Sequence, residues 1–302
     1  MATDARPCPL CGADSAYALT ARDRNREASS ESFTYNRCGS CGTVFMIDVP
    51  ADLARYYVGD YHGFGPDGTP EWAHNPTLLA VEAWRMAMLG RHVEPGTLID
   101  VGAGAGAFSA AAKGAGFEVS AIEMDRGCCE YLERGLGVRA ICSDQPIAAL
   151  RDLPPAGAIS MWHVLEHLSD PAEMLATAAE RLEPGGALAI GVPNPGSLQF
   201  RLLGTRWAHL DAPRHLCLMP KEALVAHLQG LGMRLLESTT GDPFGQICSL
   251  HGWAWALRTR PAQGEASTAV MRSAQAITKA LSPIEGRGGE GAALTLLFVK
   301  TT

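Results

Sequence analysis

The stretch TLIDVGAGAGAFSAAAKGAGFEVSAIEMD, residues 97–125, decides the fold of this chain. Its order is an apolar run, glycines at alternate positions, an alanine-rich stretch and a second apolar run that stops at Glu123, which predicts strand, turn, helix and strand. Gly102, Gly104 and Gly106 let the backbone turn tightly and approach a ligand closely, and the following helix N-terminus offers free N–H groups. An acid about 20 residues on can bind both hydroxyls of a ribose. The stretch therefore predicts a nucleoside-cofactor site.

Strands and helices are expected to alternate from residue 97 to residue 192, which indicates a parallel sheet covered by helices. Further strands are expected at 138–141, 158–162 and 187–192, with a turn at 183–186 before the last of them. Asp170 before Pro171 predicts the start of a helix over 171–182, and residues 72–91 predict an amphipathic helix. Residues after the carboxyl end of a strand face the ligand crevice in such sheets, which makes Asp144 and His163 candidates for cofactor contact.

The composition fits a soluble globular protein with one large α/β domain and a small accessory one. The chain has 302 residues, of which 47% are hydrophobic and 19% charged. Its net charge of −7 argues against a large basic surface for nucleic acid. The chain contains no apolar stretch of about 20 residues, so we expect no membrane span. The N-terminus is polar, so we expect no signal peptide. We therefore expect a cytoplasmic protein with reduced cysteines.

Four of the nine cysteines form two C-x-x-C pairs near the N-terminus, each followed by glycine. Two such pairs can place four sulfurs in a tetrahedron, which suits structural Zn²⁺. Short strands at 16–19 and 32–35 would complete a zinc ribbon. A redox C-x-x-C, the alternative, usually opens a helix beside a strand, and neither pair does. The predicted metal ligands are Cys8, Cys11, Cys38 and Cys41.

The glycine spacing alone does not identify the cofactor, because Gly102-x-Gly104-x-x-Ala107 also satisfies the dinucleotide fingerprint of NAD enzymes. Asp100 directly before the turn argues against NAD, as do the segments that follow. In order and spacing, the whole chain resembles class I S-adenosylmethionine-dependent methyltransferases, in particular a bacterial group with a cysteine-rich N-terminal ribbon. The motifs that carry this resemblance are CPLCG, CGSCG, LIDVGAGAGAF (98–108), AIEMD (121–125), WHVLEHLSDP (162–171), RLEPGGALAIGVPN (181–194) and HLDAPRHL (209–216).

This resemblance, over about residues 8–240, implies a doubly wound, mostly parallel seven-stranded Rossmann-like sheet with a reversed final hairpin. Residues 233–238 and 292–299 are its expected last strands. We divide the chain into a zinc ribbon (1–48), a linker with helices (49–95) and a methyltransferase domain (96–302) with a helical lid at about 241–290. A dimer contact is the alternative role for the lid.

The same resemblance implies the cofactor contacts. In the family the glycine loop contacts the methionine part, the acid after the second strand binds the ribose, and residues after the third strand lie near the adenine. A tyrosine of the linker would cover the cofactor, unless these tyrosines only pack between domains. The predicted S-adenosylmethionine ligands are Tyr57, Tyr61, Gly102, Gly104, Gly106, Glu123, Met124, Asp144 and His163.

Methyl transfer from a sulfonium is an in-line displacement, so the protein mainly aligns the acceptor and removes a proton. Histidine suits proton removal because its pKa lies near neutrality, and the candidate bases are His163, His209 and His215. His163, Glu166 and His167 also match a zinc-peptidase pattern, but the helix expected from Asp170 leaves no room for it. A divalent metal at these three residues, as in ubiquinone-type O-methyltransferases that resemble this segment, is a second alternative. A purely structural role for Glu166 and His167 is a third.

The loop after the fifth strand and the lid are expected to bind the acceptor. Its predicted ligands are Trp207, Asp211, Arg214 and Trp253. The alternative is that Arg214 and His215 lock this loop onto the core.

These features predict an enzyme that methylates a small molecule, at an oxygen, in natural-product or sugar metabolism. One alternative is a ribosomal RNA methyltransferase that binds RNA through ribbon arginines such as Arg22, Arg24, Arg26 and Arg37. Another is a cofactor-binding scaffold without catalysis. We expect a monomer or homodimer with no membrane or nucleic-acid partner.

Overall fold

The computed structural model describes residues 6–57, 63–65, 67–258 and 267–301. Its central sheet has seven strands in the order β10-β11-β8-β7-β4-β5-β6. All neighbours from β8 to β6 are parallel, whereas β11 runs antiparallel to both β8 and β10. The expected seven-stranded sheet with a reversed final hairpin is therefore confirmed. The strands are β4 (Thr97–Val101), β5 (Glu118–Glu123), β6 (Arg139–Cys142), β7 (Ala156–Trp162), β8 (Leu182–Pro193), β10 (Met233–Thr239) and β11 (Ala293–Lys300).

Helices cover both faces of this sheet, because successive strand residues point to opposite faces and are apolar on both. Leu98 packs on one side with α1 and α2, while Ile99 packs on the other with α4, α5 and α7. The helices are α1 (Pro76–Leu89), α2 (Ala107–Gly114), α3 (Arg126–Glu130), α4 (Pro146–Asp152), α5 (Pro171–Arg181), α6 (Leu198–Leu203), α7 (Lys221–Gly230), α8 (Pro243–Ala256) and α9 (Thr268–Ser282). Short 3-10 and π turns, η1–η7, complete the fold at 54–56, 71–74, 131–135, 165–167, 204–206, 208–210 and 283–287.

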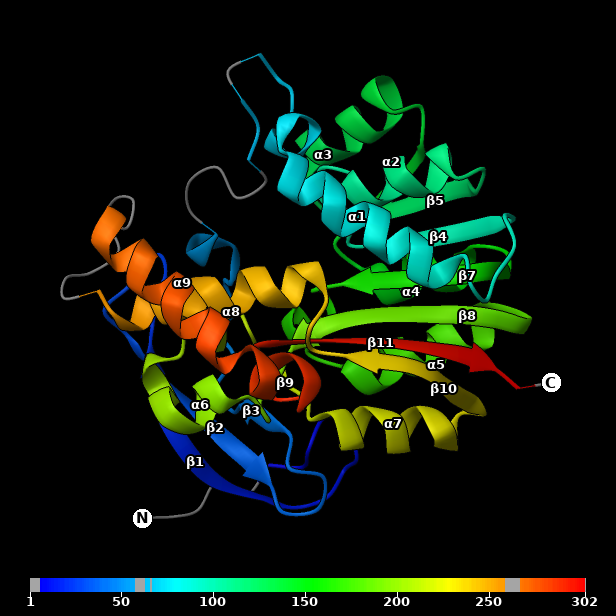
Figure 1. Ribbon diagram of the computed structural model, residues 1–302. Helices are drawn as coiled ribbons and strands as arrows, with labels where there is room; N and C mark the ends of the chain where they lie inside the picture. Colours follow the sequence, from blue (N-terminus) through cyan, green and yellow to red (C-terminus); the bar gives the residue numbers. More distant parts are fainter. Residues whose placement is uncertain (1–5, 58–62, 66, 259–266, 302) are drawn as a thin grey trace.

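A second, four-stranded antiparallel sheet contains a strand that the sequence did not reveal. Three of its strands come from the N-terminal segment, namely β1 (Ser15–Arg22), β2 (Ser32–Cys38) and β3 (Val44–Met46). The fourth is β9 (Cys217–Leu218), which pairs with β3. Figure 1 shows this sheet at one end of the seven-stranded sheet, below α8 and α9. The N-terminal segment is therefore built into the loop that follows β8.

Two elements differ from their predicted bounds. The helix expected over 72–91 begins only at Pro76, because the Asn75 side chain accepts hydrogen bonds from the N–H groups of Thr77 and Leu78 and caps it. Residues Glu71–His74 form a separate 3-10 turn, η2. The expected turn at 183–186 is contained in β8, which begins at Leu182.

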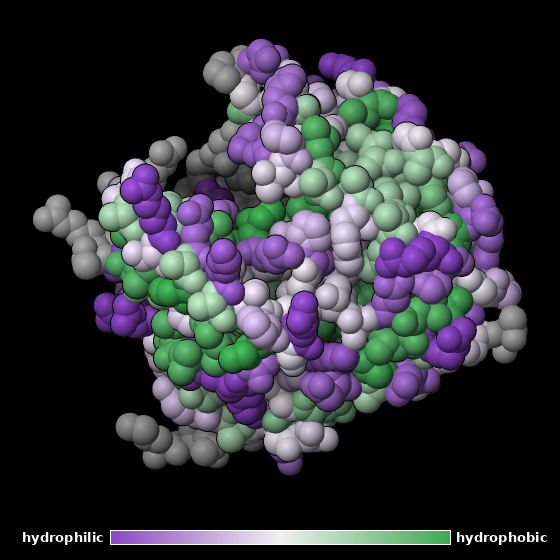
Figure 2. Space-filling model, in the orientation of Figure 1, coloured by the Kyte–Doolittle hydropathy of each residue, from purple (hydrophilic) through white to green (hydrophobic). Residues whose placement is uncertain are grey.

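The space-filling view shows a hollow between the lobe that carries α1 and the lobe that carries α8 and α9 (Figure 2). No helix among the described residues is both long and apolar enough to cross a membrane.

Candidate active site

The glycine turn lies where β4 ends. Gly102, Gly104 and Gly106 all have positive φ angles, of 69°, 53° and 81°, a region that favours glycine. A Cβ atom on Gly102 would lie 2.4 Å from Val164 Cγ2, so a larger residue would collide with the segment after β7. The turn therefore presents bare backbone that a cofactor can approach closely.

Glu123 joins the end of β5 to the glycine turn. One carboxylate oxygen accepts hydrogen bonds from the N–H groups of Met124 and Asp125, at 2.8 and 2.9 Å. The other oxygen accepts one from the N–H of Gly104 at 2.8 Å. Because a carboxylate offers about four lone-pair positions, these bonds leave room for a ribose hydroxyl. The geometry fits the predicted role of Glu123.

The other predicted cofactor ligands lie in different surroundings. Met124 is 68% exposed beyond Glu123, and Asp144 is exposed after β6. The Tyr57 hydroxyl lies 3.0 Å from Nδ1 of His167, so it faces this histidine and not the glycine turn. Tyr61 lies outside the described residues.

Trp72 contacts the glycine turn although the sequence did not single it out. Its indole N–H donates to the carbonyl oxygen of Ala105 at 2.9 Å, so η2 lies against the turn. The periodicity that placed Trp72 inside a helix hid this contact, because it grouped the residue with the apolar face of α1.

His163 follows β7 and has a backbone conformation that is rare for a residue with a side chain, with φ of 60°. Its Nδ1 lies 3.0 Å from Oε1 of Glu166, whose side chain is fully buried. No hydrogen bond to its Nε2 is found among the described residues, and the side chain is 24% exposed. A carboxylate that accepts from Nδ1–H fixes the ring and leaves Nε2 able to take a proton.

Aromatic and charged side chains surround His163. The Phe244 ring, from α8, lies 4.7 Å from the His163 ring, and the Arg85 guanidinium lies 4.1 Å from the Trp162 ring. The carboxylate of Asp242 is buried nearby, and burial raises its pKa. Burial, followed by the Arg85 cation, lowers the pKa of His163 to about 3. The ring is therefore neutral near pH 7.

The other two candidate bases are held by backbone carbonyls. His209 Nε2 donates to the carbonyl oxygen of Cys248 at 2.9 Å, and burial lowers the His209 pKa to about 4. His215 Nδ1 donates to the carbonyl oxygen of His209 at 2.9 Å. Of the three residues considered for a divalent metal, Glu166 and His167 converge with His215 within 4.8 Å, and His163 stays outside this group.

Arg214 lies in the interior and not at an acceptor pocket, which corrects its predicted role. Its side chain is fully buried, and its N–H groups donate to both carboxylate oxygens of Asp23 and of Asp211 at 2.6–3.2 Å. A further bond reaches the carbonyl oxygen of Tyr56 at 2.9 Å. Asn25 also donates to Asp211, at 2.6 Å. Arg214 thus locks the loop after β8 to the segment after β1.

The two predicted acceptor tryptophans are also buried, and the same correction applies to them. Trp207 is 2% exposed and packs against Phe200, with ring centroids 5.1 Å apart. Trp253 is 8% exposed, and its indole N–H donates to Glu285 at 2.9 Å. Neither ring offers an open face to a ligand.

Replacing Arg214 by Met is expected to lower the free energy of unfolding by about 3–5 kcal/mol, because two buried carboxylates would lose their cation. Chemical denaturation measures this change. The matched control is Arg91→Met, which breaks an exposed pair with Glu237 and should cost under about 1 kcal/mol. Equal losses in both variants would contradict the structural role of Arg214.

The four predicted metal-binding cysteines come together. Their Sγ atoms lie within 4.8 Å of one another, with Cys8–Cys41, Cys11–Cys38 and Cys11–Cys41 separations of 3.7, 3.5 and 3.5 Å. A tetrahedral site with metal–sulfur bonds of about 2.3 Å has sulfurs about 3.8 Å apart. The spacing fits such a site.

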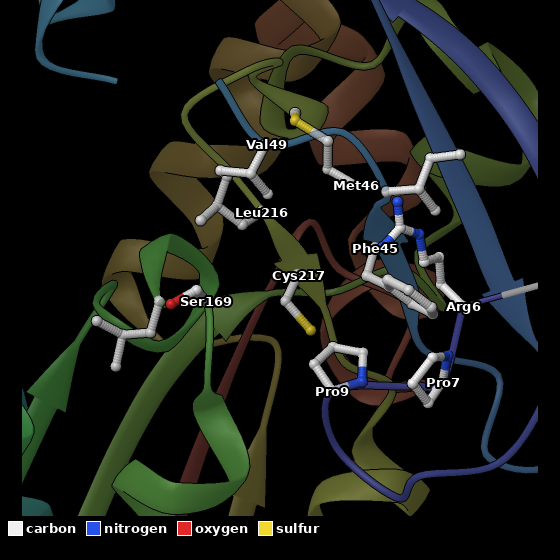
Figure 3. A pocket seen from close by; sticks show the side chains of 11 residues that line it. Arg6, Pro7, Pro9, Phe45, Met46, Val49, Ser169, Leu216 and Cys217 are labelled. Carbon is white, nitrogen blue, oxygen red and sulfur yellow. The ribbon is translucent and has the colours of Figure 1, made fainter. Parts of the chain in front are cut away.

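A pocket of about 240 Å³ lies beside β3 and β9 (Figure 3). It is lined by Arg6 and Pro9 near the first cysteine pair, by Phe45 of β3, and by Ser169 and Cys217. None of the predicted cofactor or acceptor residues lines it. Ligand pockets usually exceed about 300 Å³, and we regard this space as a packing gap between the small sheet and the segment after η4.

With this geometry in place, comparison with known proteins identifies the class. The family model described as a methyltransferase domain matches residues 72–238, and the chain belongs to this family. The match and the curated relatives make the protein an S-adenosylmethionine-dependent methyltransferase. The cysteine pairs and α8 and α9 lie outside the matched residues.

Two relatives carry the name ubiquinone biosynthesis O-methyltransferase. The protein from Caulobacter vibrioides is 30% identical over 174 residues, which cover 52% of this chain and 68% of the relative. The protein from Xylella fastidiosa strain M23 is 31% identical over 160 residues, which cover 50% and 61%. The chain thus spans less than two thirds of the length of the second relative.

Solved structures of methyltransferases match more of the chain at lower identity. A SAM-dependent methyltransferase from Archaeoglobus fulgidus has a TM-score of 0.48 at 20% identity, over 73% of this chain and 93% of that one. A putative sarcosine dimethylglycine methyltransferase from Galdieria sulphuraria has a TM-score of 0.49 at 16% identity, over 74% and 86%. Similarity at this level carries no argument about the substrate.

Proposed function

We propose that this enzyme methylates a hydroxyl group of a small molecule in natural-product or sugar metabolism, with His163 as the general base. The observation that carries the proposal is the His163–Glu166 pair, which fixes the imidazole beside the glycine turn and leaves Nε2 available. The relatives' name fits O-methylation and does not specify the acceptor of this chain. Phe244 beside the His163 ring suits an acceptor with a ring.

When bound, S-adenosylmethionine supplies an activated methyl group on a sulfonium. The backbone of the glycine turn would hold its methionine part, and Glu123 would accept hydrogen bonds from its ribose. Met124 and Asp144 are proposed to flank the adenine. His163 would accept the acceptor's proton as the new bond to oxygen forms, and a positioned base of this kind contributes about 10²- to 10⁴-fold.

We further propose that Cys8, Cys11, Cys38 and Cys41 hold a structural zinc ion in a ribbon over residues 1–48. The sulfur separations and the two glycines after the pairs, Gly12 and Gly42 with φ of 73° and 77°, support this proposal. A four-sulfur site has no open position for a substrate, so the ribbon would act as a scaffold. Residues 49–95 and 96–302 remain our proposed linker and methyltransferase domain.

The test combines binding and turnover. Calorimetry should show S-adenosylmethionine binding to the full chain and a loss of at least tenfold in Glu123→Ala, with Glu118→Ala, at the exposed start of β5, unchanged. A panel of catechol, simple phenols, monosaccharides and total RNA is then assayed for methyl incorporation. Methylation of a hydroxyl compound supports the proposal. Methylation of RNA alone would support the ribosomal alternative, and binding with no methylation of any compound would support the scaffold alternative.

A further inference from the structure

The strands β2 and β3 of the small sheet hold the end of the loop that leads into β9. The Tyr35 hydroxyl, on β2, donates to the carbonyl oxygen of His215 at 2.9 Å, and the Tyr35 side chain is fully buried. The N–H of Met46, on β3, donates to the carbonyl oxygen of Leu216 at 2.9 Å. Directly after these residues, β9 pairs with β3 (Figure 3). Two neighbouring strands therefore fix the backbone of two consecutive residues.

The same stretch of backbone holds Glu166 on its other side. The N–H of Leu216 donates to the carbonyl oxygen of Glu166 at 2.6 Å. Glu166 belongs to η4, a 3-10 turn of three residues, and such turns have poorer hydrogen-bond geometry than α-helices. Its buried carboxylate lies 3.0 Å from Nδ1 of His163. Leu216 thus bonds to β3 through its carbonyl oxygen and to Glu166 through its N–H.

His163 depends on this support because its backbone conformation is unfavourable. Its φ is 60°, and such conformations persist only where the surrounding structure holds them. A shift of the Glu166 backbone would move the carboxylate that fixes the imidazole. A misplacement of about 1 Å, caused far from the reacting atoms, can slow an enzymatic step about 10²-fold.

We propose that Tyr35 is a positioning residue for His163, which acts through the backbone of residues 215–216 and through Glu166. The proposal rests on the proposed role of His163 as general base. It extends that role to strands outside the methyltransferase-domain match, which begins at residue 72. Because the Tyr35 hydroxyl donates to a backbone carbonyl, it acts on the geometry of the site. The N-terminal strands would then be part of the catalytic framework.

The Tyr35 ring also belongs to an apolar cluster that includes Leu216 and Leu218. Phenylalanine keeps the ring and removes only the hydroxyl, so Tyr35→Phe separates the hydrogen bond from the packing. The matched control is Tyr17→Phe, because Tyr17 lies on β1 of the same sheet and is 64% exposed.

The kinetic test uses the full chain, with catechol or whichever panel hydroxyl compound is methylated as the acceptor. Tyr35→Phe should slow single-turnover methylation at least tenfold, while the affinity for S-adenosylmethionine stays within threefold of wild type. Tyr17→Phe should keep the wild-type rate. A loss of less than tenfold in Tyr35→Phe, or an equal loss in Tyr17→Phe, would overturn the proposal.

A double-mutant cycle tests the route through Glu166. If Tyr35 acts through Glu166, its hydroxyl has no further effect once the carboxylate is gone. Adding Tyr35→Phe to Glu166→Ala should therefore slow methylation by less than threefold beyond Glu166→Ala alone. A further loss of threefold or more would show that the two residues act independently, which contradicts the route.

Two measurements need no acceptor, so they decide the link between Tyr35 and His163 even if the proposed function fails. In Tyr35→Phe, the ¹⁵N ring resonances of His163 should move, with those of the exposed His92 unchanged. In the unaltered chain, the amide hydrogen of Leu216 should be protected from exchange at most tenfold better than that of Met46, because both open together. Unmoved His163 resonances would overturn the proposal. A larger difference in protection would do so too, since Glu166 would then be held without β3.

Discussion

His163→Gln should slow single-turnover methyl transfer by about 10²- to 10⁴-fold, the range for loss of a positioned base. Glutamine keeps a polar side chain beside Glu166 but cannot take up a proton. Rapid-quench measurement of S-adenosylhomocysteine formation gives the rate, and calorimetry should show S-adenosylmethionine affinity within threefold of wild type. His227→Gln, on α7, is the matched control and should keep the wild-type rate.

The pH dependence sharpens this prediction. Because burial and Arg85 lower the pKa of His163 to about 3, the base is already unprotonated throughout pH 5–8. Acidification from pH 8 to pH 5 should therefore cause no loss of rate from protonation of this group, and the loss should begin only as the pH approaches 3. A rate in His163→Gln within threefold of wild type, with cofactor binding intact, would show that another group removes the proton.

Loss of the proposed zinc ion is expected to unfold the cysteine-rich segment and to disorder the loop that carries His209 and His215. Zinc binding contributes on the order of 10 kcal/mol to the folding of small zinc modules, and the four-stranded sheet of this segment is small. Cys38→Ser should abolish the bound zinc equivalent and make β9 and the loop that precedes it accessible to protease. Elemental analysis and limited proteolysis measure both effects.

Cys142→Ser is the control for this experiment, since Cys142 is exposed at the end of β6 and lies outside the four-cysteine group. It should retain one zinc per chain and the wild-type digestion pattern. Unchanged proteolysis of zinc-free Cys38→Ser would show that the segment folds without metal and that the loop does not depend on it.

The sequence could predict the features that depend on neighbouring residues. The apolar runs placed the first five strands of the large sheet within a few residues, because their periodicity is local, and the family resemblance supplied the last two. Gly102 and Glu123 could be singled out because the strand–turn–helix unit fixes their positions. The two cysteine pairs were visible for the same reason, since each forms its own tight turn.

Features that depend on distant residues could not be predicted. The pairing of β9 with β3 involves two residues with no strand signal of their own. Arg214 looked like a ligand for an acceptor because its two carboxylate partners, Asp23 and Asp211, are brought together only by the fold. From the sequence, His163, His209 and His215 were equally good candidates for the general base. Only the hydrogen-bond partners of their ring nitrogens, which the structure shows, distinguish His163 from the other two.

The pairing of β9 with β3 also bears on the order in which the chain can fold. Asp23 and Arg214, which join the small sheet to the loop before β9, are 191 positions apart. The small sheet therefore cannot be completed until most of the chain has been synthesised. Closing so long a loop is slow. Until then the outer edge of β3 exposes unpaired backbone groups, a surface on which two nascent chains could associate. The two cysteine pairs, which are synthesised early, would keep the edge of β3 in its folded conformation until β9 pairs with it.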